Sequence, residues 1–571
     1  MISAAEVEAK VRAGESLAGQ TITDVDLRGR NLSGAQMGEA RFLHVSLQGA
    51  NLAGANLKGT RWTSCWLSGA SLEGADLSDA QFVSVDLARA NLKTAHLSKA
   101  ALGGSVDLRG ANLSGADLHD AVLTEGRLAG ANLHGADLTG ARADQADLNG
   151  VDLSDATIVN TSFVKADLTA AVLRGARIDA GVFMTAILIG ADFSGAKTDK
   201  SLFVKADLRG AILPKVLRAA VLIEAVFGPD PRKPTMPASE YTLDFGGADL
   251  TGAVLGNADL RGANFRGATL EKTGLMGCDL TGAYFTGAIL KRSILTNANL
   301  RGVNLSGLTL DMLIINQADL RGTDLSGSTV LMSTLETTKL DGANLTGTTF
   351  KQAQMRGATM QGAIFDRTIF HRTVLMEMDL TKLPFKGLSI TKCVIKNSKL
   401  HGMDLRGCDF TDTLFDESDL SQADLRDSIL QRAKFRKAKL DMVNAAGVAA
   451  KGAFFAEASL KLAKFGKAKL RGSTFTKAEM DHADFAGADM RESVMTEMQA
   501  SAVAFRGAQL QFSDLSHSHV EDADFSGADV KNATLHAIHD TGSIWLGANR
   551  SSGNGTDIDR LEAEVWTRPK S

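Results

Sequence analysis

Large hydrophobic residues return every five positions along most of this chain. The stretch 247–270 reads GADLTGAVLGNADLRGANFRGATL, and its large apolar residues are Leu250, Leu255, Leu260, Phe265 and Leu270. An α-helix returns an apolar residue to one face about every 3.6 positions and a strand every second position, so neither explains this spacing. The same spacing continues over residues 22–102, 108–213 and 250–535. A fixed short period over such lengths predicts a solenoid.

Each unit of five residues predicts one short strand followed by a corner. In the unit ADLTG, Ala248 and Leu250 are two positions apart, so both point to one side of an extended segment. Asp249 then points to the other side. Thr251 and Gly252 turn the chain, a role that suits small and flexible residues. Every unit therefore faces the interior with one small and one large residue and faces the solvent with polar ones.

The spacing of the aromatic residues indicates how many units close one coil. Phenylalanines recur at intervals of twenty in two sets that are offset by ten, Phe415, Phe435, Phe455 and Phe475, and Phe465, Phe485, Phe505 and Phe525. A coil of four units would stack each set into one internal column and place the two columns on opposite walls. The sequence therefore predicts an all-β solenoid with four sides of about five residues each.

The repeated pattern A(D/N)LxG resembles the pentapeptide-repeat family, and the resemblance extends over most of the chain. It implies a right-handed quadrilateral β-helix, and the handedness comes from the resemblance alone. The opening residues 5–29, AEVEAKVRAGESLAGQTITDVDLRG, are also similar to the start of pentapeptide domains encoded with bacterial type VI secretion systems. That second similarity implies an effector-loading adaptor or a secretion accessory.

The two ends of the chain depart from the repeat and are predicted to close the solenoid. Residues 1–18 are predicted to form an N-terminal helical cap, with Ser3 as the N-cap and Gly14 after the last turn. Such a cap covers a strand edge that would otherwise invite aggregation. The repeat fades after Leu535, so residues 539–571 are expected to form a C-terminal cap and tail.

A proline-rich segment, 214–244, interrupts the repeat and predicts two stacked β-helices, 19–213 and 245–538. Five of the seven prolines lie in this segment. Its part 216–227, VLRAAVLIEAVF, is apolar and compatible with a helix that ends at Gly228 and Pro229. We expect this helix to plug the first β-helix and to be followed by an irregular linker. The alternative is a hinge or a helix that docks a partner.

Composition and motifs favour a protein without an enzymatic site. The net charge of −4 and the pI of about 6.3 do not indicate a bulk nucleic-acid binder. The chain has no apolar run of membrane length and no signal-peptide core at its start, so we expect a cytoplasmic protein. It has no nucleophile elbow, phosphate loop, zinc-protease motif or CxxC pair, and we expect no catalytic residue and no cofactor. Four cysteines occupy the small inward position and are predicted to be reduced, buried fillers: Cys65, Cys278, Cys393 and Cys408.

A local excess of positive charge is the first candidate for a binding surface. The stretch 432–477 holds twelve basic and two acidic residues. In a four-sided coil these basic residues would point outward on all four walls and form a basic belt, which either docks an acidic protein or phosphate-rich partner or is only solvated charge. Few exposed aromatics accompany it, which disfavours nucleic acid. The residues predicted to bind the partner are Lys434, Arg436, Lys437, Lys439, Lys451, Lys461, Lys464, Lys467, Lys469 and Arg471.

Four histidines near the end of the repeat are the second candidate. The pair His519 and His539 is twenty residues apart and should stack on adjacent coils, and His517 and His536 would flank it. With the carboxylates of Glu521 and Asp540 nearby, these imidazoles could hold zinc or nickel. The alternative is a set of surface histidines at the end of the solenoid.

These features favour a non-enzymatic scaffold or adaptor for protein–protein interaction, with a type VI secretion accessory as its most specific form. One alternative is a DNA mimic, because some smaller proteins of the resembled family protect DNA gyrase by imitating duplex DNA. That function needs a strongly acidic surface, and this chain is nearly balanced in charge. The other alternative is a metal-binding site at the C-terminal end.

Overall fold

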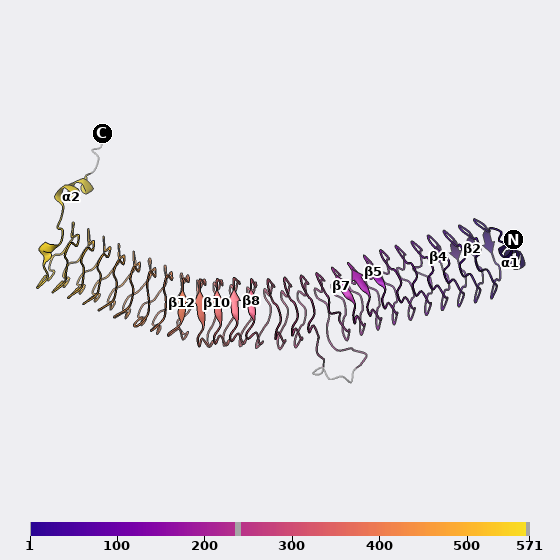
Figure 1. Cartoon of the computed structure of the whole chain (residues 1–571), viewed down its shortest axis with the longest axis horizontal. Helices are drawn as coiled ribbons and strands as arrows, with labels where there is room; N and C mark the ends of the chain where they lie inside the picture. The colour runs from indigo at the N-terminus through magenta and orange to yellow at the C-terminus, as the bar shows by residue number, and fades with distance from the viewer. Residues whose placement is uncertain (1, 234–240, 567–571) are drawn as a thin grey trace. The chain divides into compact units, whose positions relative to one another are not determined.

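The computed structural model describes residues 2–233 and 241–566 and forms two compact units, Met1–Ala298 and Asn299–Ser571. Within each unit, successive coils lie side by side and pair in parallel (Figure 1). The predicted fold class, an all-β solenoid, is therefore confirmed. The boundary between the units falls inside the predicted domain 245–538, and the five-part division of the chain stays a prediction.

Most sides of the coils pair through a single residue, and only twelve three-residue segments of the described chain form longer strands. The first unit contains a sheet of β1 Thr21–Thr23, β2 Arg41–Leu43, β3 Arg61–Thr63 and β4 Gln81–Val83, and a sheet of β5 Thr157–Val159, β6 Arg177–Asp179 and β7 Lys197–Asp199. The second unit contains one sheet of β8 Thr309–Asp311, β9 Thr329–Leu331, β10 Thr349–Lys351, β11 Ile369–His371 and β12 Ser389–Thr391.

Three backbone hydrogen bonds join each regular side to the same side of the next coil. On one side of the second unit, the Ile364 amide donates to the Ala343 carbonyl at 2.9 Å, and the Leu345 amide donates to the Ile364 carbonyl at 2.8 Å. The Gly347 amide donates to the Asp366 carbonyl at 2.7 Å. These bonds run from coil to coil, so the backbone groups of a thin core are paired without side chains.

The backbone conformation at the corners explains which residue types are frequent at two positions of the repeat unit. The fifth residue of the unit has a positive φ, for example 71° at Gly252 and 57° at Lys437, which is why glycine is frequent there. The residue before the central apolar one accepts a hydrogen bond at the corner, as when Asp424 Oδ1 accepts from the Arg426 amide at 3.2 Å. This local bond favours aspartate and asparagine at that position.

The twenty-residue spacing of phenylalanines produces two internal columns of stacked rings. In the first column, the ring centroids of Phe415, Phe435, Phe455 and Phe475 are separated successively by 5.0, 5.0 and 4.8 Å. In the second, those of Phe465, Phe485, Phe505 and Phe525 are separated by 5.2, 5.7 and 5.1 Å. All eight side chains are buried. The two columns meet edge to face between Phe455 and Phe465 at 5.8 Å, which fills the interior between opposite walls.

The cysteines occupy buried, small inward positions. All four are free thiols. Burial raises the pKa of Cys393 to about 12 and that of Cys278 to about 11, because an apolar surrounding disfavours the thiolate. They therefore pack as small apolar residues.

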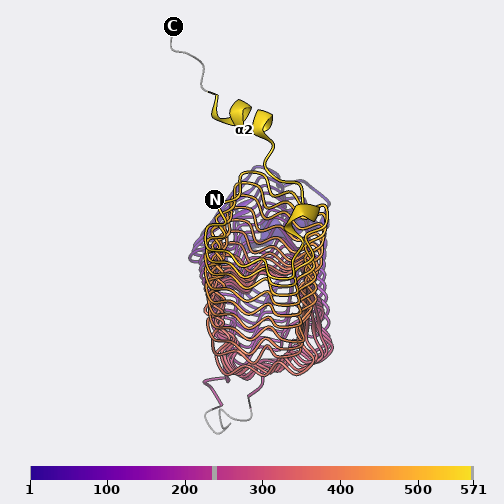
Figure 2. The ribbon, with the colours of Figure 1, turned by 90° about the vertical axis from the view of Figure 1, so that its left-hand side faces the viewer.

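Short helices form the two ends. The helix α1 Ala4–Arg12 has the predicted N-cap, because Ser3 and Glu6 form a capping box. Val7 of α1 is buried, and Glu8 bonds Arg30 of the first coil at 3.0 Å. At the other end lie a short 3₁₀ turn, η2 Arg550–Ser552, and α2 Ile558–Val565, which Figure 2 shows outside the stack of coils. Neither helix of the described chain has the length and apolarity that crossing a membrane requires.

The helix predicted over 216–227 is wrong, because this segment continues the solenoid. Val216, Val221 and Val226 pair with Lys197, Leu202 and Asp207 of the preceding coil, respectively. The segment VLRAAVLIEAVF keeps a period of five, with its β-branched valines at the outward strand position, and neighbouring coils supply the pairing that a helix would lack. Coil-to-coil bonding extends to Gly228, whose carbonyl accepts from the Gly210 amide at 2.8 Å, and is present again at Asp244, which pairs with Asn264. The predicted linker residues 234–240 lie outside the described residues.

Candidate functional site

The ten residues of the basic belt that are predicted to bind the partner are all exposed and lie on every side of the coils in the second unit. Four of its lysines occupy the outward strand position of four different sides. Their partners on the next coil are Phe454 for Lys434, Ser459 for Lys439, Asp484 for Lys464 and Asp489 for Lys469. The belt therefore surrounds the coils rather than covering one face.

Within the belt the charges gather into two clusters on opposite sides. The first basic cluster lies on two adjoining sides and their common corner and contains Lys434, Arg436, Lys437 and Lys439. The second basic cluster lies on the other two sides in the following coil and contains Lys464, Lys467 and Lys469. A partner with a flat surface can contact one of these clusters but not both.

The two clusters differ in how far acidic neighbours neutralise them. In the first, Lys437 Nζ lies 3.4 Å from a Glu457 carboxylate oxygen. Outside both clusters, Lys461 and Arg471 of the belt form ion pairs at 2.8 and 2.5 Å. In the part of the chain that the structure describes, no residue of the second cluster forms an ion pair. Lys434, Arg436 and Lys439 of the first cluster also form no ion pair among the described residues, so each cluster offers three unpaired cations, and the second is the one in which every member is unpaired.

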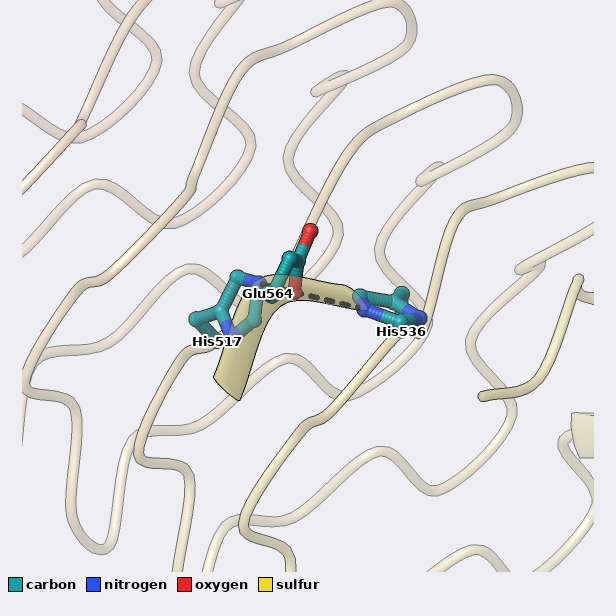
Figure 3. A group of neighbouring side chains, drawn as sticks. All are labelled: His517, His536 and Glu564. Carbon is teal, nitrogen blue, oxygen red and sulfur yellow. Dashed lines mark hydrogen bonds and ion pairs between the residues drawn. The ribbon is translucent and has the colours of Figure 1, made fainter. Parts of the chain in front are cut away.

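The four histidines form two separate groups, each with one glutamate. In the first group, Nε2 of His517 and Nε2 of His536 lie 3.0 and 3.1 Å from the same oxygen of Glu564 (Figure 3). The two rings are nearly perpendicular, at 83°, with centroids 5.2 Å apart. Glu564 belongs to α2, so this group joins the helix to the coils.

His536 is 1% exposed, and its two ring nitrogens have different roles. Nδ1 accepts a hydrogen bond from the Asp557 amide at 3.1 Å. A ring nitrogen that accepts carries no proton, so the ring is neutral and its proton lies on Nε2, which faces Glu564. Hydrogen bonds from Arg560 and His536 hold the pKa of Glu564 below its usual value. Both ends of α2 are therefore fixed to the last coils through His536.

The second group contains His519, His539 and Glu521. The two rings stack in parallel, with centroids 4.3 Å apart and planes at 3°. Nδ1 of His519 lies 3.1 Å from Glu521. Burial alone would raise the pKa of Glu521, but hydrogen bonds from its own backbone amide and from His519 outweigh it and lower the pKa. Asp540, expected near these histidines, instead pairs with Arg550 at 2.8 Å.

The two groups fit a metal ion unequally. An imidazole binds a metal through a lone pair in the ring plane, so two parallel stacked rings cannot both point at one ion, whereas perpendicular rings can. The first group therefore has the better geometry. In this group, however, Nε2 of His536 carries the proton of the ring. An ion bound at Nε2 would move that proton to Nδ1, and the hydrogen bond from the Asp557 amide would break.

The sequence-based prediction does not include Glu564, because it assigns residues 539–571 to a cap and tail. A signal was present, since Asp557 precedes IDRLEAEV, in which apolar residues recur at helical spacing. Asp557 is indeed the N-cap of α2 and accepts from the Arg560 amide. The five-residue period does not extend to α2, so the repeat pattern does not predict this helix.

Three solved structures show similarity to parts of this chain. No match is found among curated protein sequences. Among solved structures, QnrB1, a plasmid-mediated fluoroquinolone resistance protein, is 19% identical over 31% of this chain and 90% of that chain, with a TM-score of 0.22. HetL, a pentapeptide repeat protein involved in heterocyst differentiation regulation from the cyanobacterium Nostoc sp. strain PCC 7120, is 28% identical over 51% and 96%, with a TM-score of 0.15. A pentapeptide repeat protein from the Arabidopsis thaliana thylakoid lumen is 28% identical over 24% and 69%, with a TM-score of 0.12.

The family comparison covers much more of the chain. The model described as pentapeptide repeats (8 copies) matches residues 22–59, 63–104, 105–140, 136–175, 186–217, 244–282, 278–311, 333–372, 404–441, 458–496 and 505–537. These segments span more than half of the sequence and coincide with the coils described above. The chain belongs to the pentapeptide-repeat family.

Proposed function

We propose that this protein is a non-enzymatic scaffold or adaptor that binds an acidic surface of another protein through its basic belt. The observation that carries the proposal is the second basic cluster. Lys464, Lys467 and Lys469 are exposed on adjoining sides of one coil, without an ion pair among the described residues. Like charges at this spacing repel one another, and an acidic partner would relieve that repulsion.

The backbone beneath the cluster favours docking with little ordering. The amides of Lys464 and Lys469 donate to Val443 and Val448 of the preceding coil, each at 2.8 Å. The lysines therefore project from a paired, buried framework, and binding would restrict only their side chains. Electrostatic attraction of this kind acts mainly on the rate of association.

Two other functions, a type VI secretion accessory and a DNA mimic, have weaker support than the scaffold. A type VI secretion accessory is supported only by the similarity of the opening residues, and the scaffold does not depend on it. A DNA mimic that binds DNA gyrase or topoisomerase needs an acidic surface, and the most acidic stretch, 107–147, holds seven acidic and three basic residues. There Asp107 is paired with both Arg109 and Arg127, at 2.6 and 3.4 Å, which reduces its charge further. Inhibition of gyrase by the purified chain would favour the DNA mimic over the scaffold.

The test begins with recovery of partners from the native host by the full chain and their identification by mass spectrometry. The triple variant Lys464→Gln, Lys467→Gln, Lys469→Gln should then slow association by roughly tenfold at low salt, and the wild-type rate should fall as salt rises. Glutamine is preferred to glutamate because Asp484 and Asp489 lie next to two of these positions on the following coil.

A matched control removes the same charge from the opposite sides. The variant Lys434→Gln, Arg436→Gln, Lys439→Gln should keep the wild-type association rate. Equal slowing in both variants would show that only net charge matters, and unchanged rates in both would place the docking surface outside the belt. Far-ultraviolet circular dichroism of each variant should match the wild type, since all six positions are exposed.

A further inference from the structure

Two adjoining sides of the second unit, 358–362 against 378–382 and 363–367 against 383–387, lack the coil-to-coil hydrogen bonds that regular sides have among the described residues. Between residues 343–347 and 363–367 the second of these sides carries its three regular bonds. Between residues 363–367 and the same side of the following coil, residues 383–387, none of the three equivalent backbone hydrogen bonds forms among the described residues. The amides of Phe365 and Arg367 and the carbonyls of Ala363, Pro384 and Lys386 are left without backbone partners.

On the side of 383–387, the proline at the outward strand position removes one of the three donors. Pro384 has no amide hydrogen, so it cannot donate to the Ala363 carbonyl. The Phe385 amide bonds the Leu383 carbonyl at 3.0 Å instead of reaching the next coil. The core beneath stays packed, because the rings of Phe365 and Phe385 meet edge to face at 5.6 Å.

The missing bonds leave a groove at the surface. It has a volume of about 660 Å³ and is lined by residues 363–369, Pro384 and residues 386–389. Ile364 and Ile369, on its wall, are 54% and 41% exposed. On the adjoining side the coils remain joined, since Phe370 of β11 pairs with Ile390 of β12. The groove therefore adjoins a paired side at β11 and β12 and a second unpaired side, 358–362 against 378–382, within the described chain.

The charges around the groove are positive on balance. Asp366 is paired with Arg367 at 3.2 Å, and Asp404 on the following coil is paired with Arg406 at 2.7 Å. Lys386, at the corner that borders the groove, is exposed and forms no ion pair in the described chain. Lys382, at the preceding corner, is exposed and equally without one. Lys382 and Lys386 thus flank the open ladder without an ion pair among the described residues, although Asp379 and Asp404 lie within electrostatic reach of them, respectively.

We propose that this groove binds an extended, acidic peptide segment of another protein. Two backbone donors and three backbone acceptors line it, and an extended peptide backbone offers both kinds of group in the same spacing. The exposed isoleucines would pack against alternate side chains, and Lys382 and Lys386 would pair with acidic ones. The groove lies outside the basic belt, so this interaction is independent of the docking surface proposed above.

The test uses the full chain and fluorescein-labelled twelve-residue peptides in which threonine alternates with glutamate or with lysine. Fluorescence anisotropy should show binding of the glutamate peptide and at least tenfold weaker binding of the lysine peptide. Pro384→Val restores the missing amide and should weaken binding of the glutamate peptide at least tenfold. Hydrogen exchange should be fast over 363–367 in the wild type and slow in Pro384→Val, whereas 343–347 should be slow in both.

Charge variants separate the groove from general attraction. Lys382→Glu with Lys386→Glu should weaken binding of the glutamate peptide at least tenfold, whereas Lys93→Glu with Lys99→Glu, the same charge change at exposed residues of the first unit, should leave it unchanged. Equal binding of both peptides, equal loss in both double variants, or slow exchange over 363–367 in the wild type would overturn the proposal. So would a dimer of the free chain that Pro384→Val dissociates, because the occupant would then be a second copy.

Discussion

At the scale of single residues, the fold depends on which side of the strand a side chain occupies. Leu460 is completely buried at the central inward position, and Leu462, two residues later, is 53% exposed at a corner with a φ of 58°. The same residue type therefore has opposite environments within one repeat unit. Leucine is required at the first position and is unfavourable at the second, where its backbone conformation suits aspartate or asparagine better.

The substitution of each leucine by aspartate tests this difference. Leu460→Asp places an unpartnered carboxylate in an apolar core and should lower the free energy of unfolding by at least about 3 kcal/mol. Leu462→Asp should change it by no more than about 0.5 kcal/mol, because the side chain stays in solvent. Urea denaturation followed by circular dichroism measures both. Equal midpoints for the two variants would contradict the assignment of inward and outward positions.

At the scale of elements, the first histidine group is the better candidate for a metal ion. After incubation with zinc and desalting, we expect about one equivalent to remain on the wild type and on His519→Ala, and less than about one-tenth on His517→Ala. Because zinc would displace the proton on His536 Nε2, the bond from Asp557 should break and trypsin should cut faster at Arg560 of α2. Retention of zinc by His517→Ala with loss in His519→Ala would assign the ion to the stacked pair instead.

The elements also show how far the sequence could predict the structure. The period of five and the twenty-residue spacing of Phe435 and Phe455 predicted strands, corners and columns, because each coil repeats the same local chemistry. The segment 216–227 was misread as a helix because its composition suits both structures, and only the pairing with neighbouring coils decides between them. The group around Glu564 could not be predicted from the repeat, since a helix outside the period supplies its carboxylate.

At the scale of the whole molecule, the coil of twenty residues is the structural unit. Deletion of 441–460 removes one coil and brings Phe475 onto Phe435, so the aromatic column is preserved. Deletion of 441–445 rotates everything after it by one side, so Phe455 no longer stacks on Phe435, at a cost of about 0.5–1.5 kcal/mol for that pair. Thermal unfolding should show a higher Tm for the longer deletion than for the shorter one. An equal or reversed order would mean that the columns contribute nothing beyond leucine packing.

The hydrogen bonds between coils also determine how this protein responds to mechanical force. Within each unit they run from one coil to the next, so a load that pulls a terminus away from the stack acts on the bonds of one side at a time. Each side can release its three bonds and two buried residues while the sides behind it stay intact. The molecule would therefore lengthen in many small steps rather than in one rupture. The side that holds Pro384, which has already lost its three bonds, would yield at a lower force than the sides that keep theirs.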